Sequence, residues 1–298
     1  LAIYERMKAL GCEETAIRDS ICTIPTSGIT YEFTRMVYEI LGLNIDCLAD
    51  KFTAYGLLEV KNASGKIDYE KIAALLTQAK PFNTITLHDT VAEGDEKVKF
   101  DVVVGNPPYQ LKGGSGGTND APIYQHYVEV AQTIKPEYAT LIMPSKWFTA
   151  GRENLLGDFR KHMLENHGIQ KMVVHSDFRD LFPSVNIKGG LCYYLYNARY
   201  SGDCSYKLVQ SGQELTTMRR LDEYDILIQN SRLADLVKKI SEQVEPGTGT
   251  VADIISSDTP FGIPTNPATS KKNPFEIFDR KTRNHSVKLF YLDKAVRK

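Results

Sequence analysis

The chain has few cysteines, and none of them are paired at metal-binding spacing. Its 298 residues contain five cysteines, and no Cys-x-x-Cys pair occurs. An odd and widely spaced set argues against both a structural zinc site and a disulfide framework, and it fits a reducing cytoplasm. The five are Cys12, Cys22, Cys47, Cys192 and Cys204.

Long apolar runs and a secretory leader are also missing. No stretch of 18 apolar residues is present, so we expect no membrane-spanning helix. The sequence already has the character of a helix interior at Leu1, and the segment from Asp293 to Lys298 ends without a helix stop signal. We therefore expect the chain to be a fragment of a longer protein.

The chain also lacks a large net charge of either sign. The chain carries 36 basic and 37 acidic residues, a formal net charge of −1, so it does not bind nucleic acid through bulk positive charge. The exception is the segment from Lys271 to Lys298, where nine cations face three anions. This segment either contacts phosphates or forms a solvated tail.

What the sequence does contain is an alternation of helix and strand patterns. Apolar residues at helical spacing predict helices, for example over 30–41, where Phe33, Val37 and Leu41 fall on one face. Right-handed crossovers between such elements predict an α/β, Rossmann-like fold: a doubly wound, mainly parallel sheet with an antiparallel edge hairpin. The other predicted helices are 3–10, 13–21, 48–60, 69–79, 122–134, 152–165 and 231–244. The predicted strands are 21–25, 84–87, 101–104, 138–143, 169–175, 224–228 and a strand pair of 186–196 with 204–208.

The most informative segment runs from Phe100 to Tyr109 and reads Phe-Asp-Val-Val-Val-Gly-Asn-Pro-Pro-Tyr. Its β-branched residues predict a buried strand, which two prolines must end because each fixes φ and lacks an N–H donor. The side chain of Asn106 and the backbone carbonyls of Asn106 and Pro107 offer acceptors for an –NH2 group, and Tyr109 offers a flat face for a planar ring. Open α/β sheets bind ligands at such strand ends. The segment predicts a site for a planar amine, and a turn that only ends a strand is the alternative.

The run from Asn106 to Tyr109 resembles the Asn-Pro-Pro-Tyr motif of S-adenosylmethionine-dependent amino-methyltransferases. The order of segments from Ile21 to about Ile240 is similar to the adenine-N6 methyltransferase part of type IIG restriction–modification enzymes. This resemblance implies a partial methyltransferase fold, S-adenosylmethionine as the methyl donor, no metal, and an adenine flipped out of double-stranded DNA as the substrate.

Other amine methylases share the motif. It occurs in glutamine methylases of release factors and in guanine methylases of ribosomal RNA, so a protein-glutamine or RNA amine methyltransferase is the alternative. Cytosine amino-methyltransferases usually carry Ser or Asp where Asn106 stands, and no Pro-Cys motif for attack on cytosine C5 is present. The resemblance therefore favours adenine.

The resemblance assigns the catalytic set to the turn itself. Asn106 and Pro107 would accept hydrogen bonds from the amine, and Tyr109 would stack on the base. The methyl donor that the resemblance implies is already activated, so the enzyme is expected to act mainly by positioning the amine.

Three more aromatic or acidic residues are candidates. Asp89 matches the acidic residue near the cofactor's adenine, which together with Asn106 gives the expected cofactor-binding residues; an Asp after a strand is also a common turn residue. Phe182 lies where the family places a second aromatic residue against the base, with core packing as the alternative. Trp147 either lines the pocket or packs in the core.

One part of the family pattern is missing. The Gly-rich cofactor loop that normally precedes the first helix is absent, and the run from Gly113 to Gly117 follows the substrate turn, where it cannot replace that loop. We expect residues 1–245 to form an N-terminally truncated catalytic domain and 246–298 a linker and the beginning of a target-recognition domain. Upstream cofactor-loop and nuclease regions are expected to be fused in the full-length chain. A catalytically inactive, DNA-binding specificity piece is a further alternative.

Overall fold

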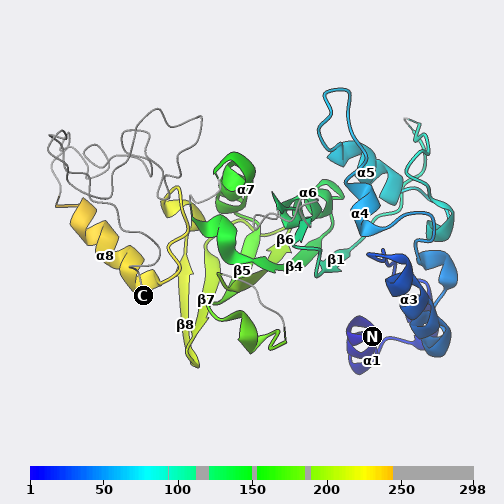
Figure 1. The fold of residues 1–298 in the computed structure, drawn as a ribbon. Helices are drawn as coiled ribbons and strands as arrows, with labels where there is room; N and C mark the ends of the chain where they lie inside the picture. The colour runs from blue at the N-terminus through cyan, green and yellow to red at the C-terminus, as the bar shows by residue number, and fades with distance from the viewer. Residues whose placement is uncertain (93, 112–120, 150–152, 185–188, 244–298) are drawn as a thin grey trace, which may run out of the picture. The chain divides into compact units, whose positions relative to one another are not determined.

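The computed structural model describes residues 1–92, 94–111, 121–149, 153–184 and 189–243 (Figure 1). The chain divides into two compact units, Leu1–Asp235 and Leu236–Lys298. The predicted linker and recognition segment, 246–298, and the glycine run from Gly113 to Gly117 lie outside the described residues. Among the residues described, no helix has both the length and the apolar character needed to cross a membrane.

The first unit is built on a six-stranded mixed sheet with the order β1-β4-β6-β5-β7-β8. β1 pairs with β4 and β5 pairs with β7 in parallel, and the other three neighbouring pairs are antiparallel. Four of the six strands therefore run in the same direction. The strands are β1 (Val102–Gly105), β4 (Tyr138–Pro144), β5 (Ile169–His175), β6 (Leu191–Asn197), β7 (Cys204–Gln210) and β8 (Gln213–Arg219), and a separate two-stranded sheet is formed by β2 (Gln110–Leu111) and β3 (Ala121–Pro122).

Two helices connect the parallel strands and cover one face of the sheet. α6 (Tyr124–Thr133) links β1 to β4, and α7 (Glu153–Glu165) links β4 to β5. Both helices belong to the main buried cluster, and the rings of Tyr124 and Phe159 meet edge to face with 6.1 Å between centroids. The predicted mixed α/β, Rossmann-like fold is thus confirmed.

Five of the described helices form the N-terminal part of the unit. α3 begins after Ser27, whose hydroxyl accepts from the N–H of Thr30 at 3.3 Å in a capping box, and it ends at Gly42 in the left-handed conformation. The helices are α1 (Ala2–Ala9), α2 (Glu14–Arg18), α3 (Gly28–Leu41), α4 (Ala54–Leu57), α5 (Tyr69–Leu76) and, further along the chain, α8 (Ser231–Ser241), with 3₁₀ turns η1 (Ile45–Cys47), η2 (Phe82–Thr84), η3 (Ser145–Phe148), η4 (Phe178–Asp180) and η5 (Leu221–Glu223).

The predicted strand pair of 186–196 with 204–208 is wrong. β6 inserts between β4 and β5 and is antiparallel to both, whereas β7 pairs with β5 and β8. Apolar and aromatic residues follow one another along β6, which suits an interior strand that has a neighbour on each side. The edge hairpin is formed by β7 and β8, joined at Ser211 and Gly212, which both have positive φ as tight hairpin turns require.

Three other predicted strands are not formed as strands. Residues 82–84 form the turn η2, in which the Thr84 hydroxyl donates to the Pro81 carbonyl at 2.7 Å. Residues 224–228 follow η5, and the Leu227 N–H donates to the Phe148 carbonyl instead of a neighbouring strand. The 21–25 segment forms one isolated parallel bridge, at Thr23. A local turn contact therefore replaces strand pairing at Thr84, whereas bonds to residues distant in the sequence replace it at Leu227 and limit it to one bridge at Thr23.

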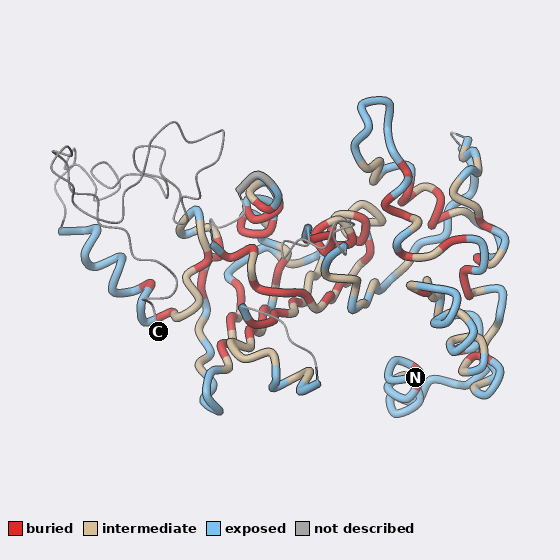
Figure 2. The backbone as a smooth tube through the Cα atoms, viewed as in Figure 1, coloured by how far each residue is buried: buried red, intermediate tan, exposed pale blue. Residues whose placement is uncertain are grey.

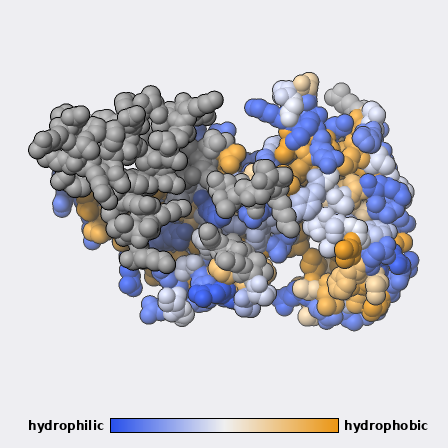
Figure 3. Space-filling view, in the orientation of Figure 1, coloured by the Kyte–Doolittle hydropathy of each residue, from blue (hydrophilic) through white to orange (hydrophobic). Residues whose placement is uncertain are grey.

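The helix predicted over 30–41 is confirmed as α3. Phe33 is 69% exposed, and Ile29, Met36 and Ile40 are each more than half exposed. The buried residue of α3 is Tyr38. Figure 3 shows apolar surface gathered over the N-terminal helices. The helical spacing correctly predicted the helix, but it did not show which side of the helix is buried.

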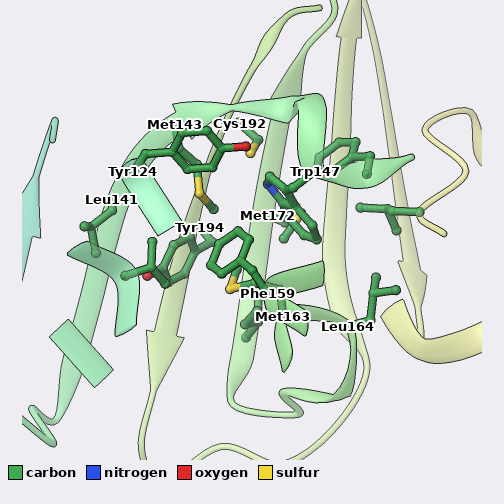
Figure 4. Packing of buried hydrophobic residues seen from close by; sticks show 14 of the residues in the cluster. Tyr124, Leu141, Met143, Trp147, Phe159, Met163, Leu164, Met172, Cys192 and Tyr194 are labelled. Atoms are coloured by element: carbon green, nitrogen blue, oxygen red, sulfur yellow. The ribbon is translucent and has the colours of Figure 1, made fainter. Parts of the chain in front are cut away.

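The main core lies between the sheet and helices α6 and α7. Buried residues follow the strands of the sheet in Figure 2, and Figure 4 shows how their side chains interlock. Trp147 is fully buried, with ring centroids 4.6 Å from Phe148 and 5.7 Å from Phe159. Burying one large apolar side chain stabilises a fold by about 1.5–3 kcal/mol. Of the two interpretations of Trp147, core packing is confirmed.

A second cluster belongs to the N-terminal part, where Phe52 and Phe82 meet edge to face at 5.9 Å. Two hydrogen bonds from α6 tie this part to the sheet region. The Tyr127 hydroxyl donates to the Ala54 carbonyl at 3.0 Å, and the Tyr69 hydroxyl lies 2.7 Å from Nδ1 of His126.

Gly190 makes a close backbone approach where β6 begins. It is buried with φ +81°, and an added Cβ would lie 2.5 Å from the His175 carbonyl oxygen. We expect Gly190→Ala to lower the free energy of unfolding by about 2–4 kcal/mol, measured by urea denaturation. Gly212→Ala is the matched control, because Gly212 has φ +73° with open space around it, and its loss should be only about 1 kcal/mol. Equal losses in the two variants would contradict the close approach.

Candidate active site

The Asn-Pro-Pro-Tyr turn begins where β1 leaves the sheet. The last paired residue of β1 is Gly105, opposite Leu141 of β4. Because β1 and β4 are parallel, their carboxyl ends lie at the same end of the sheet. The turn after β1 is therefore at the same end of the sheet as Pro144, where β4 ends. This is the end at which α/β sheets place ligands.

Asn106 presents its side chain to solvent. Along β1, Val103 packs against the main cluster, while Val102 and Val104 are 56% and 46% exposed on the other side. Asn106 continues the exposed alternation and is itself exposed. The following proline restricts its backbone to extended conformations, which keeps the side chain on this side. The amide is accessible, as an amine-binding site requires.

Tyr109 is anchored rather than free. Its ring packs against the main cluster at intermediate exposure, and its carbonyl accepts from the Ile123 N–H at 3.1 Å. Its hydroxyl oxygen is buried without a hydrogen-bond partner among the described residues. Burial raises the pKa of Tyr109 to about 12, with a smaller contribution from the charge of Cys192. The phenol therefore stays protonated at neutral pH.

The exit from the turn is fixed by the short sheet that follows. Gln110 and Leu111 pair with Pro122 and Ala121 in antiparallel register. On α6, the side-chain amide of Gln125 is buried and donates to the Pro122 carbonyl at 2.9 Å. Asn106 therefore lies between two fixed elements, β1 before it and the β2–β3 pair after it.

Asp89 sits in a turn, not at the end of a strand. Its carboxylate accepts from the Thr86 hydroxyl at 2.6 Å, from the Thr86 N–H at 3.1 Å, and from the ammonium group of Lys80. These bonds, first the one from Lys80 and then those from Thr86, lower the pKa of Asp89 from 3.8 to about 2. The carboxylate is ionised at neutral pH, and the partners found for it are those of a turn residue. The described contacts do not join Asp89 to the Asn106 turn.

Phe182 has intermediate exposure in the segment after β5. Its N–H donates to the Phe178 carbonyl at 2.9 Å, which closes the turn η4. The chain then continues into 185–188, outside the described residues.

Three residues at the same end of the sheet, Ser145, Gly189 and Gly190, were not singled out from the sequence. The Ser145 hydroxyl donates to the Gly189 carbonyl, and the Ser145 N–H donates to the Gly190 carbonyl at 3.2 Å. These bonds join the end of β4 to the start of β6. The consecutive glycines at 189 and 190 were the signal that could have predicted such a close approach.

The structure thus brings together an accessible asparagine amide, held between a strand end and two prolines, and an anchored tyrosine in a Rossmann-like sheet. The family model described as Eco57I restriction-modification methylase matches residues 32–182. The chain belongs to this family.

A curated relative supports the same class. A protein of Mycoplasma pneumoniae (strain ATCC 29342 / M129 / Subtype 1), described as an uncharacterized adenine-specific methylase, is 39% identical over 107 residues. The match covers 35% of this chain and 25% of the relative, so the chain spans about a quarter of that protein's length.

Several solved structures share a distant likeness. The methyltransferase subunit of a type I restriction–modification system from Streptococcus thermophilus is 14% identical with a TM-score of 0.36, and the match covers 74% of this chain and 42% of that one. The type IIG restriction endonuclease BpuSI is 16% identical with a TM-score of 0.29, covering 49% and 17%. The assignment rests on the family match and not on these likenesses.

The buried hydroxyl and the ring of Tyr109 should contribute very differently to stability. Tyr109→Phe keeps the ring and removes an unpaired buried polar atom, so its free energy of unfolding should change by less than about 1 kcal/mol. Tyr109→Ala removes the packing and should cost about 2–4 kcal/mol in urea denaturation. If Tyr109→Phe were as destabilising as Tyr109→Ala, the hydroxyl would have a partner and the anchoring described here would be wrong.

Asp89 gives a pH dependence of known sign. Because its folded pKa is lowered, its stabilising contribution is present above the ordinary pKa of 3.8 and is lost as the pH falls toward about 2. Asp89→Asn should therefore be less stable than the unsubstituted chain at pH 7, and the difference should shrink at pH 3. Urea denaturation at both pH values measures this. In a Lys80→Met background the effect of Asp89→Asn should be smaller; an unchanged effect would show that Lys80 is not its main partner.

Proposed function

We propose that the protein containing this chain transfers a methyl group from S-adenosylmethionine to the N6 amine of adenine in double-stranded DNA, as part of a restriction–modification system. The family match and the relative described as an adenine-specific methylase support the class of reaction. The single observation that supports the site is the accessible Asn106 amide at the end of β1, followed by a rigid turn into the anchored Tyr109.

The chemistry follows from what adenine offers. Its amine is paired and stacked inside a duplex, so it must be flipped out before it can react. The Asn106 side-chain oxygen and the Pro107 carbonyl would accept the two N–H bonds of the amine, which directs its lone pair away from the turn. Tyr109 would stack on the ring, with Phe182 as a second aromatic contact. These residues act by positioning and by polarising the amine, without removing its proton in advance.

The methyl donor supplies a methyl group on a positively charged sulfur, which needs no further activation. The residues present fit this donor in part. Asn106 is exposed at the strand end, whereas the carboxylate of Asp89 already holds Lys80 and Thr86. Asp89 is ionised and so can still accept from a donor group, but binding the cofactor there would require it to share or release Lys80.

The domain arrangement belongs to the same proposal. Residues 1–245 would form the catalytic part and 246–298 a linker leading into target recognition, with cofactor-loop and nuclease regions elsewhere in the protein. Duplex DNA would be the partner, and the cytoplasm the location.

Substitution of Asn106 tests the proposed role. In the complete polypeptide expressed from its gene, Asn106→Ala should lower methyl transfer from labelled S-adenosylmethionine to DNA by about 100-fold or more, because the amine loses its orienting acceptor. Asn106→Asp keeps an acceptor at the same position and should retain more activity than Asn106→Ala. Melting temperatures of both variants should match the unsubstituted protein, since the side chain is exposed.

Two outcomes would reject the proposal. One is substantial DNA methylation by Asn106→Ala. The other is methyl transfer to RNA or to a protein glutamine, with none to DNA, under the same conditions; that result would favour the other class of amine methyltransferase.

A further inference from the structure

Cys22 and Cys47 are far apart in the sequence but adjacent in the structure. Thr23 and Leu48 form an isolated parallel β-bridge, in which the Thr23 N–H donates to the Cys47 carbonyl at 2.9 Å and the Ala49 N–H donates to the Thr23 carbonyl at 3.0 Å. Each cysteine stands one residue before a bridge partner. In parallel pairing, residues in register lie side by side, with their side chains on the same face.

The two thiols interact with each other, and the Cys47 thiol also donates to the Asp19 carbonyl at 3.7 Å. A hydrogen bond between them raises the pKa of Cys22, and burial adds to that rise. The same hydrogen bond lowers the pKa of Cys47, against the opposing effects of burial and of the carboxylates of Asp19 and Asp46. Of the pair, Cys47 is therefore the thiol that ionises first and acts as the nucleophile.

The geometry suits a disulfide. Neighbouring strands lie about 4.8 Å apart, within the range of Cα separations that disulfides span. Cys22 is exposed and Cys47 partly so, and neither is bonded to another cysteine. Cys192 and Cys204, by contrast, are buried in the sheet.

We propose that Cys22 and Cys47 are a reversible thiol–disulfide site that takes glutathione disulfide as its oxidant. The Cys47 thiolate attacks one sulfur of glutathione disulfide, forming a mixed disulfide and releasing one glutathione thiolate. Cys22 then loses its proton to solvent or to that thiolate and attacks the Cys47 sulfur, releasing the second glutathione. The protein loses two protons and two electrons, and the two glutathiones gain them.

Oxidation would close a loop around α3. The bridged residues flank this helix, and the Tyr38 hydroxyl on α3 already donates to the Ile21 carbonyl at 2.8 Å and lies 2.6 Å from the Thr23 hydroxyl. The bond would therefore form within an existing set of contacts, and it would restrict the unfolded chain. The oxidised protein should melt about 5 °C or more above the reduced one.

Peptide mapping without a reducing agent tests the site directly. The folded 298-residue chain is equilibrated with mixtures of reduced and oxidised glutathione, quenched with acid, alkylated and digested. A peptide linking Cys22 to Cys47 should appear as the oxidised fraction rises, and it should disappear again in excess reduced glutathione. Glutathione adducts alone, or links of Cys22 to Cys12 or between molecules, would overturn the proposal.

Matched variants separate the pair from ordinary exposed thiols. Cys12→Ser removes an exposed cysteine outside the bridge and should leave the linked peptide and the rise in melting temperature intact. Cys22→Ser removes the resolving thiol and should trap Cys47 as a glutathione adduct, with no rise in melting temperature on oxidation. Cys47→Ser removes the attacking thiol and should likewise abolish the rise, which keeps the test valid if Cys22→Ser folds poorly. A full rise in melting temperature in either of these two variants would contradict the site.

Discussion

Two consecutive prolines after Asn106 are the constraint on which the site depends. They cannot continue the β-ladder, so β1 must end at Gly105. They also hold Asn106 extended, on the exposed side of the alternation that places Val103 against the core. The direction of one amide side chain is thus decided by the proline that follows it together with the packing of Val103.

The rest of the unit fixes both ends of that turn. β1 is held by its register with β4, and the exit is held by the Ile123 N–H on the Tyr109 carbonyl and by packing of the tyrosine ring. At the neighbouring strand end, Ser145 bonds to the backbone of Gly189 and Gly190. A rigid edge of this kind suits a reaction in which the protein mainly positions an amine, because small displacements of the reacting groups are costly.

The parts of the fold that could be predicted are those governed by local periodicity. β5 was predicted with its observed bounds, and β4, α6 and α7 within two residues at each end. Strand partners depend on contacts between distant residues, so the insertion of β6 between β4 and β5 was missed. The buried side of α3 could not be predicted for the same reason, and Phe33 on its apolar face is exposed.

At the site, the strength of the sequence signal differed between residues. The Asn106 turn could be predicted because two prolines leave few conformations open. Asp89 was placed after a strand, whereas Thr86 and Lys80 draw it into a turn through contacts that spacing alone does not reveal. Trp147 is apolar and large enough for either role, and only the packing against Phe148 and Phe159 decides for the core.

The identity of the methylated base tests the central claim most directly. Genomic DNA from cells that express the complete gene product can be digested to nucleosides and analysed by mass spectrometry, alongside DNA from cells lacking the gene. N6-methyladenine that depends on the gene is the expected result, because we propose that the turn presents acceptors and a ring to a planar purine amine. Gene-dependent methylation of cytosine instead, or no gene-dependent change in DNA while RNA or protein is methylated, would contradict it.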